Sequence, residues 1–125
     1  MRLLLDTHIL LWLLENSLRL KPRARSLILN ADEVFVSSAT IWEIAIKFRL
    51  GKMQEAPELV VTELESAGLR KLDVTYRHAV ATAKLPLIHG DLFDRLLVAQ
   101  AIAEHLQFVT ADPKLAAYSG LVTVV

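Results

Sequence analysis

The sequence His-Gly-Asp-Leu-Phe-Asp-Arg-Leu-Leu-Val-Ala-Gln-Ala-Ile-Ala, residues 89–103, predicts a helix that the rest of the fold covers. Gly90 interrupts the segment before it, and Asp91 stands where an N-cap residue belongs. Apolar side chains recur at helical spacing in two rows, which are Leu92, Leu96, Ala99 and Ala103, and Phe93, Leu97 and Ala101. A helix with two apolar rows is buried on most sides. The carboxylates of Asp91 and Asp94 in its first turn therefore either cap the helix and offset its dipole or belong to a metal site.

Short apolar runs and helical segments alternate along the chain. Strands are expected at Arg2–Leu5, Val34–Ser37, Lys71–Val74, Phe108–Thr110 and Leu121–Val125. Helices are expected at Thr7–Leu14, from Pro22 to about Asn30, from a cap at Ser38 or Thr40 to Leu50, from Pro57 to Gly68, from a cap at Thr75 to Leu85, from Asp91 to about Leu106, and at Pro113–Tyr118. Such alternation predicts an α/β fold with a parallel sheet covered on both faces. We expect a single domain over residues 1–125.

Composition excludes several classes of protein. Of the 125 residues, 54% are hydrophobic, which is enough for a substantial core and argues against disorder. The formal net charge is zero, so a nucleic-acid partner would have to meet a local basic patch. The chain has no cysteine, which excludes disulfides and thiolate zinc sites and suits the cytoplasm. The apolar run Ile9–Leu14 is too short to span a membrane, and we expect that the protein does not associate with one.

Four acidic residues occupy equivalent places in the predicted units. Asp6 follows the first strand, Glu43 lies early in the helix after the second, Asp94 lies in the first turn of the helix before the fourth, and Asp112 follows the fourth strand. In right-handed strand–helix–strand units the helix N-termini lie at the carboxyl edge of the sheet, so the four should meet there. Carboxylates at close range repel one another unless a bound cation or protonation neutralises them. Oxygen ligands suit Mg²⁺ or Mn²⁺, which would activate water against a phosphodiester.

Each acid also has a local interpretation. Asp6 could cap the helix that follows it, and Asp112 could cap the one that begins at Pro113. Glu43 could form a capping box with Thr40 or an i,i+4 ion pair with Lys47. Taken singly these interpretations suffice, but together they leave the common placement of the four unexplained.

Four ordered motifs resemble those of PIN-domain nucleases, and most closely the VapC toxins of bacterial toxin–antitoxin pairs. They are Leu-Leu-Leu-Asp-Thr-His-Ile-Leu-Leu-Trp at 3–12, Ser-Ser-Ala-Thr-Ile-Trp-Glu-Ile at 37–44, the His-Gly-Asp-Leu-Phe-Asp stretch at 89–101, and Thr-Ala-Asp at 110–112. Asp6, Glu43, Asp94 and Asp112 match the family's metal-binding acids. The resemblance implies a three-layer α/β/α sandwich, cleavage of RNA with Mg²⁺ or Mn²⁺, and inhibition by a cognate antitoxin. Leu92 departs from the family, where proline is frequent.

Other polar residues are weaker candidates. Basic residues that could track an RNA backbone are Arg19, Lys21, Arg23 and Arg25. Arg95 could hold a phosphate or pair with a nearby acid. A second basic group, Lys47, Arg49 and Lys52, is expected to be a solvated helix face. His8 and His89 could act as bases but are expected to be structural or exposed; Thr7 and Thr110 could orient carboxylates or only cap strand ends; and Asp91 is expected to be a cap.

The predicted function is a metal-dependent endoribonuclease that acts as the toxin of a toxin–antitoxin pair, with Asp6 and Asp94 as principal ligands. Expected partners are the RNA substrate, a VapB-type antitoxin and a second copy of the chain. One alternative is a non-catalytic RNA- or protein-binding module on the same fold. Another is a phosphotransfer domain, which would have a second acid two residues after Asp6 or a lysine after a late strand. His8 stands at the first position, and no lysine occupies the second. An acidic pocket for Mg²⁺ would also accept a guanidinium, so we expect an antitoxin arginine there.

Overall fold

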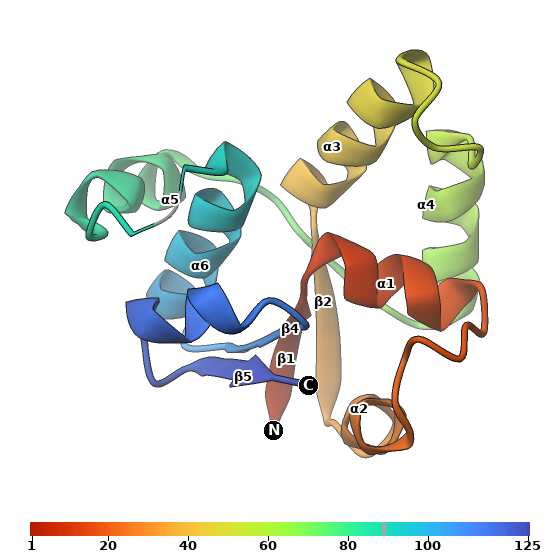
Figure 1. Ribbon diagram of the computed structural model, residues 1–125, viewed down its shortest axis with the longest axis horizontal. Helices are drawn as coiled ribbons and strands as arrows, with labels where there is room; N and C mark the ends of the chain where they lie inside the picture. Colours follow the sequence, from red (N-terminus) through yellow and green to blue (C-terminus); the bar gives the residue numbers. More distant parts are fainter. Residues whose placement is uncertain (89) are drawn as a thin grey trace.

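The computed structural model describes residues 1–88 and 90–125, and its centre is a parallel sheet (Figure 1). The strands within these residues are β1 (Arg2–Leu5), β2 (Glu33–Ser37), β3 (Arg70–Leu72), β4 (Gln107–Thr110) and β5 (Val122–Val124). They pair in the order β3-β2-β1-β4-β5, and each pair is parallel. The predicted parallel sheet is therefore confirmed, with β1 at its middle.

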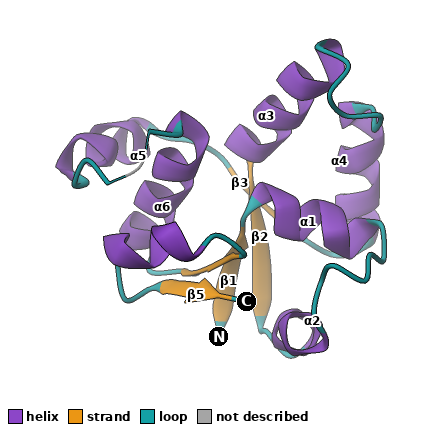
Figure 2. Cartoon of the chain, in the orientation of Figure 1, coloured by secondary structure: helices purple, strands orange, loops and turns teal. Residues whose placement is uncertain are grey.

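Helices cover both faces of this sheet, which makes the three-layer sandwich (Figure 2). One side carries α1 (Thr7–Leu14), α2 (Pro22–Leu29) and α4 (Pro57–Ser66). The other side carries α5 (Tyr76–Ala81), α6 (Leu92–Glu104) and the 3₁₀ helices η1 (Thr82–Lys84) and η2 (Pro113–Tyr118). Helix α3 (Ser38–Arg49) rises from the carboxyl end of β2 and contributes Ile44 to one core and Ala39 to the other.

The central strand shows why no polar alternation appears in its sequence. Leu3 and Leu5 pack into the core beneath α1, α2 and α4, whereas Leu4 packs into the core beneath α6. All three side chains are fully buried. Both faces of β1 therefore require apolar residues, as is usual for a parallel strand that lies between two helical layers.

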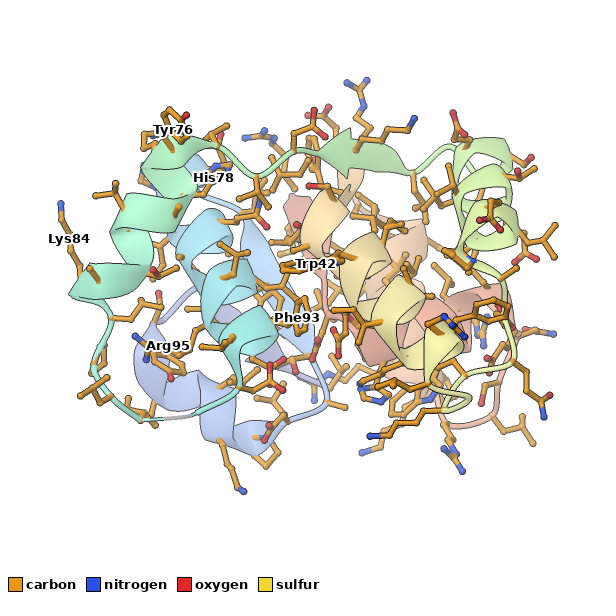
Figure 3. The ribbon with its side chains drawn as sticks, turned by 90° about the horizontal axis from the view of Figure 1, so that it is seen from above. Trp42, Tyr76, His78, Lys84, Phe93 and Arg95 are labelled. Carbon is orange, nitrogen blue, oxygen red and sulfur yellow. The ribbon has the colours of Figure 1, made fainter. Side chains whose placement is uncertain are left out.

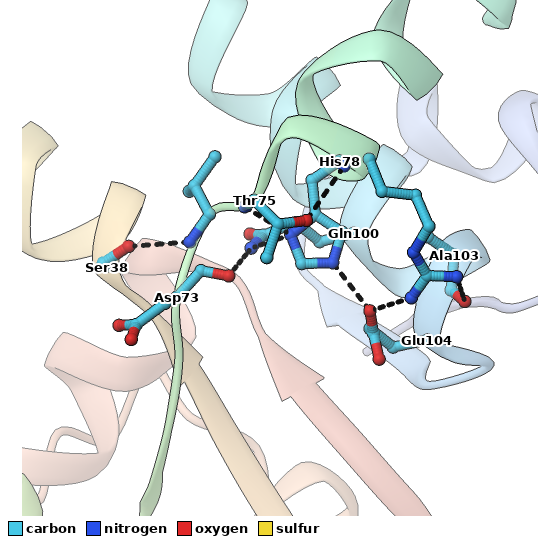
Figure 4. Close-up of polar contacts among 9 residues, drawn as sticks. Ser38, Asp73, Thr75, His78, Gln100, Ala103 and Glu104 are labelled. Atoms are coloured by element: carbon cyan, nitrogen blue, oxygen red, sulfur yellow. Dashed lines mark hydrogen bonds and ion pairs between the residues drawn. The ribbon is translucent and has the colours of Figure 1, made fainter.

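A buried histidine joins α5 to α6 (Figure 4). The main-chain N–H of Thr75 donates to His78 Nδ1 at 3.1 Å, which leaves the ring proton on Nε2. That Nε2 lies 2.7 Å from Glu104 Oε2, and Arg77 pairs with the same carboxylate. The bond from His78 lowers the pKa of Glu104, with a smaller contribution from Arg77. The network supports the long helix that carries Asp94.

Several predicted boundaries are wrong. The N-cap of α3 is Ser37, not Ser38 or Thr40, because Ser37 ends β2 in an extended conformation and its Oγ accepts from the Ala39 N–H at 3.0 Å. Strand β3 was expected at Lys71–Val74, but β2 ends at Ser37, opposite Leu72, so no partner remains for later residues. The Val74 N–H donates to Ser38 Oγ instead, at 3.2 Å.

The later helices also differ from expectation. The helix expected to run to Leu85 is α5 followed by the single 3₁₀ turn η1, where the Thr82 hydroxyl donates back to the Ala79 carbonyl at 2.7 Å. Helix α6 ends at Glu104 rather than near Leu106, because His105 adopts a left-handed conformation (φ 55°). Leu92, expected in an apolar row, is 79% exposed at the first helical position, whereas residues 97–101 are buried.

Among the described residues, no helix combines the length and apolar character that a membrane crossing requires.

The central position of Leu4 predicts a large loss of stability for Leu4→Ala. The side chain is 0% exposed, and its truncation leaves a cavity between β1 and α6, so the free energy of unfolding should fall by about 2–5 kcal/mol. Leu18→Ala is the matched control, because Leu18 is 100% exposed and its truncation should change stability by less than about 0.5 kcal/mol. Urea denaturation followed by circular dichroism measures both, and equal values would contradict the described core.

Candidate active site

Asp6 lies at the carboxyl end of the central strand and is 7% exposed. Its Oδ1 accepts from the Thr7 N–H at 2.7 Å, so it caps α1 as the local interpretation predicts. Its Oδ2 accepts from the Thr110 hydroxyl at 2.6 Å, across 104 positions of sequence. Both oxygens thus receive neutral donors from two neighbouring strand ends, which fixes the orientation of the carboxylate.

Burial raises the pKa of the Asp6 carboxyl above its ordinary value. The bonds from Thr110 and Thr7 and the charge of His8 act in the opposite direction, whereas the negative charge of Glu43 adds to the rise. No lysine or arginine of the described residues forms an ion pair with Asp6. The site therefore holds a carboxylate whose ionised form burial disfavours, without an ion pair from a lysine or arginine of the described residues to compensate.

Glu43 is joined to Asp6 through Thr7. The Thr7 hydroxyl donates to Glu43 Oε1 at 2.7 Å, while the Thr7 N–H holds Asp6. Glu43 is also 7% exposed, and its Oε2 accepts from Lys47 Nζ at 2.8 Å. The i,i+4 ion pair offered by the sequence is thus present. The capping box with Thr40 is not, because Thr40 lies inside α3 and its Oγ1 is 3.3 Å from the Thr7 hydroxyl.

An aromatic contact brings the beginnings of α3 and α6 together. Trp42 and Phe93 meet edge to face with their ring centroids 5.4 Å apart, as Figure 3 shows from above. These residues directly precede Glu43, in the second turn of α3, and Asp94, in the first turn of α6. Asp91 caps α6 as expected, because its Oδ1 accepts from the Asp94 N–H at 2.9 Å. The beginning of α6, which carries Asp94, therefore lies beside α3, which carries Glu43.

The fourth acid is attached through Thr110. The Asp112 N–H donates to Thr110 Oγ1 at 3.1 Å, and the same hydroxyl donates to Asp6. Asp112 also caps η2, since its Oδ1 accepts from the Lys114 N–H at 2.9 Å. One threonine hydroxyl thus links the main chain of Asp112 to the carboxylate of Asp6.

The donor set suits Mg²⁺ or Mn²⁺, because it consists of carboxylate oxygens at one sheet edge and contains one buried carboxylate without a lysine or arginine partner. Within residues 1–88 and 90–125, no three histidine, aspartate or glutamate side chains lie close enough to share one ion as they stand. Mg²⁺ commonly binds through one or two carboxylates and keeps several waters. A site built on two acids therefore fits this chain better than a cage of four.

The predicted RNA-contacting arginines and lysine are not gathered at this edge. Arg19, Lys21, Arg23 and Arg25 belong to α2 or the segment before it, and α2 lies near the amino ends of β1 and β2 (Figure 1). Arg25 is engaged with the Ser17 carbonyl at 3.3 Å. Their contact with RNA stays a prediction.

Arg95 has a structural role that the sequence did not indicate. It donates to the carbonyls of Pro86 at 2.8 Å and Thr82 at 3.0 Å, and its guanidinium lies 6.0 Å from the centre of the Tyr118 ring. It therefore holds the segment that precedes α6. His8 is exposed and its ring contacts Trp12, while His89 lies outside the described residues.

Sequence reasoning left the role of Thr7 undecided and did not propose Thr40. Thr7 orients a carboxylate, because its hydroxyl donates to Glu43, whereas the cap at this point is Asp6, which accepts from the Thr7 N–H. The bond from Thr7 to Glu43 spans 36 positions and depends on how α1 packs against α3. No local signal could have revealed it.

The raised pKa of Asp6 predicts that Asp6→Asn stabilises the metal-free protein. Above the folded-state pKa, wild type carries an ionised carboxylate that burial disfavours, and stability therefore falls as pH rises through that pKa. The amide keeps an acceptor for Thr7 and can donate to the Thr110 hydroxyl. In EDTA the variant should unfold at a higher urea concentration at pH 7, with a difference that shrinks as pH is lowered. A variant that is less stable at every pH would contradict this.

Comparison with known proteins agrees with this geometry. The family profile of the PIN domain matches residues 3–121. Ribonuclease VapC22 of Mycobacterium tuberculosis is 32% identical over 114 residues, which cover 90% of this chain and 88% of that protein. The crystal structure of VapBC2 from Rickettsia felis, bound to a DNA fragment from their promoter, has a TM-score of 0.70 at 19% identity and covers 100% of this chain and 98% of that one.

A second solved structure gives the same result. DNA-bound VapBC from Salmonella typhimurium has a TM-score of 0.68 at 18% identity and covers 100% of this chain and 97% of that one. At such identities the structural likeness shows a shared fold. The profile match over nearly the whole chain, the relative at 32% identity and the order of the four acidic motifs lead to one conclusion: the chain belongs to the PIN-domain family.

Proposed function

We propose that this chain is a metal-dependent endoribonuclease and the toxin of a toxin–antitoxin pair. The observation that carries the proposal is the buried Asp6 carboxylate, which is held by two neutral donors and linked through Thr7 to a second buried acid. Support comes from the relative named as a ribonuclease and from structural neighbours that are VapBC assemblies. The relative supports a ribonuclease, and the structural neighbours support a chain that assembles with a partner.

Asp6 and Asp94 are the proposed ligands of Mg²⁺ or Mn²⁺, and Glu43 and Asp112 complete the site directly or through water. When bound, the metal lowers the pKa of a water molecule and neutralises the scissile phosphate. Thr7 and Thr110 hold Asp6 so that little reorganisation is needed when the ion arrives. Glu43, whose Oε2 accepts from Lys47, is the acceptor that orients the attacking water.

The same pocket explains how a partner would inhibit the enzyme. A guanidinium is planar, always charged and bidentate toward carboxylates, so it can occupy an acidic site in place of the metal. The antitoxin's remaining contact is proposed to be a short helix in an apolar groove whose walls are α1 and α3. A second copy of the toxin chain is the expected further partner, and RNA the expected substrate.

The proposed ligands predict that Asp6→Asn and Asp94→Asn each abolish RNA cleavage. Either change removes the ligand's charge and keeps its shape, so activity should fall by at least about 100-fold, corresponding to roughly 2.7 kcal/mol or more in the barrier. Cleavage of a labelled RNA in Mg²⁺ measures the effect, and circular dichroism checks that the fold persists.

Asp73→Asn is the matched control for this experiment. Asp73 is exposed and follows β3 at the same sheet edge, but it has no proposed part in the site. The control should cleave like wild type and gain the same thermal stability from millimolar Mn²⁺. Full activity in the Asp6 or Asp94 variant would disprove the proposed site, and RNA binding without cleavage in wild type would favour the non-catalytic alternative.

The inhibitory mechanism predicts one decisive arginine in the antitoxin. Co-expression with the partner should give a stable complex without ribonuclease activity. Replacing the partner's arginines by alanine one at a time should restore cleavage in at least one case while the complex persists, since the metal then regains its ligands. If every variant still binds and still inhibits, the partner acts by steric blockage instead.

A further inference from the structure

The two buried acids of the site are neutralised in different ways. Both oxygens of Glu43 are engaged by side chains of this chain, one by the Thr7 hydroxyl at 2.7 Å and the other by the Lys47 ammonium at 2.8 Å. Among the residues that the structure describes, both oxygens of Asp6 receive only neutral donors, from Thr7 and Thr110. Of these two equally buried carboxylates, only Glu43 has a cationic side chain bonded to it.

The helix holds the ammonium in a defined place. Glu43 and Lys47 are four residues apart on α3 with the acid toward the N-terminus, which is the favourable order for such a pair. The Lys47 side chain is 33% exposed, so its charge remains partly hydrated while it contacts a carboxylate that is almost dry. The Lys47 carbonyl accepts from the N–H groups of Lys52 at 2.8 Å and Met53 at 3.3 Å, which close the end of the helix.

We propose that Lys47 is a positioning residue that stands in for a second metal ion at Glu43, so that the site loads a single divalent cation. The proposal rests on the metal dependence proposed above. In two-metal nucleases a pair of ions stabilises the attacking and leaving oxygens, and each ion neutralises the acids that hold it. Here a tethered ammonium does so permanently, and Glu43 keeps its orientation whether or not the ion beside Asp6 and Asp94 is present.

A second divalent ion at Glu43 would have to displace Lys47 or lie against it. The ammonium and the ion would repel each other at contact distance. The ammonium is covalently attached to the helix and stays at Glu43, so the free ion is excluded. Removing the ammonium reverses this balance, because it leaves a buried carboxylate without a countercharge. Glu43 should then recruit a cation from solution.

The stoichiometry of Mn²⁺ binding tests the proposal without reference to catalysis. Calorimetric titration and electron paramagnetic resonance of the free toxin should give one ion per wild-type chain. Lys47→Met should bind a second ion in the millimolar range, and Lys47→Arg should return the count to one. Lys52→Met is the control, because it removes an exposed lysine five residues further on and should leave the count at one.

The outcomes separate this inference from the proposed function. If wild type binds no Mn²⁺, both the metal dependence and the inference fail. If wild type binds two ions, or if Lys47→Met still binds only one, the metal site stands and the role of Lys47 is wrong. If Lys47→Met does not fold, Glu43→Gln/Lys47→Met removes both charges and should fold with one ion, and two ions in that variant would overturn the proposal.

Discussion

The carboxyl group of Asp6 is buried at the end of the central strand, and burial raises its pKa. The surrounding hydrogen bonds offset part of the free-energy cost of ionising it there. Asp6 is 7% exposed and lies among leucines that fill both cores. Transfer of a carboxylate from water into such surroundings is unfavourable by several kcal/mol unless donors and a cation compensate. Thr7 and Thr110 supply the donors, and the cation would be the proposed divalent metal. The proposed metal would therefore offset a free-energy cost that an exposed acid does not carry.

The two threonines connect residues that come from different parts of the chain. Thr7 contacts Asp6 through its N–H and Glu43 through its hydroxyl, and Thr110 contacts Asp6 through its hydroxyl and the main chain of Asp112. A hydroxyl can donate once and accept twice, so one small side chain can orient several groups. The site consequently depends on the parallel order of the strands, because that order brings the threonines after β1 and at the end of β4 together.

The bounds of a strand or helix could be predicted from the sequence wherever adjacent residues alone set them. The bounds of β1 and α1 are as expected, because an uninterrupted apolar run ends at an acid that caps the next helix. The cap of α3 could not be assigned, since Ser37, Ser38 and Thr40 are all suitable and the choice depends on where β2 stops pairing. The predicted bounds of β3 were wrong for the same reason, because the end of β2 also determines where β3 ends. Arg95 illustrates a further limit, because its partners are carbonyl groups, which every residue carries and no sequence pattern marks.

The sequence by itself determined the alternation of strands and helices, the order of the four acids and their common edge, because these follow from the periodicity of neighbouring residues and from the handedness of the connections. It also contained the i,i+4 spacing of Glu43 and Lys47. Only the tertiary structure decided that this pair lies against a buried Thr7, that Asp6 is bonded only to neutral donors, and that Arg95 holds the approach to α6. The bonds from Arg95 to Thr82, from Thr7 to Glu43 and from Thr110 to Asp6 join residues 13, 36 and 104 positions apart. They depend on sheet order and on the packing of helices, which no local spacing encodes.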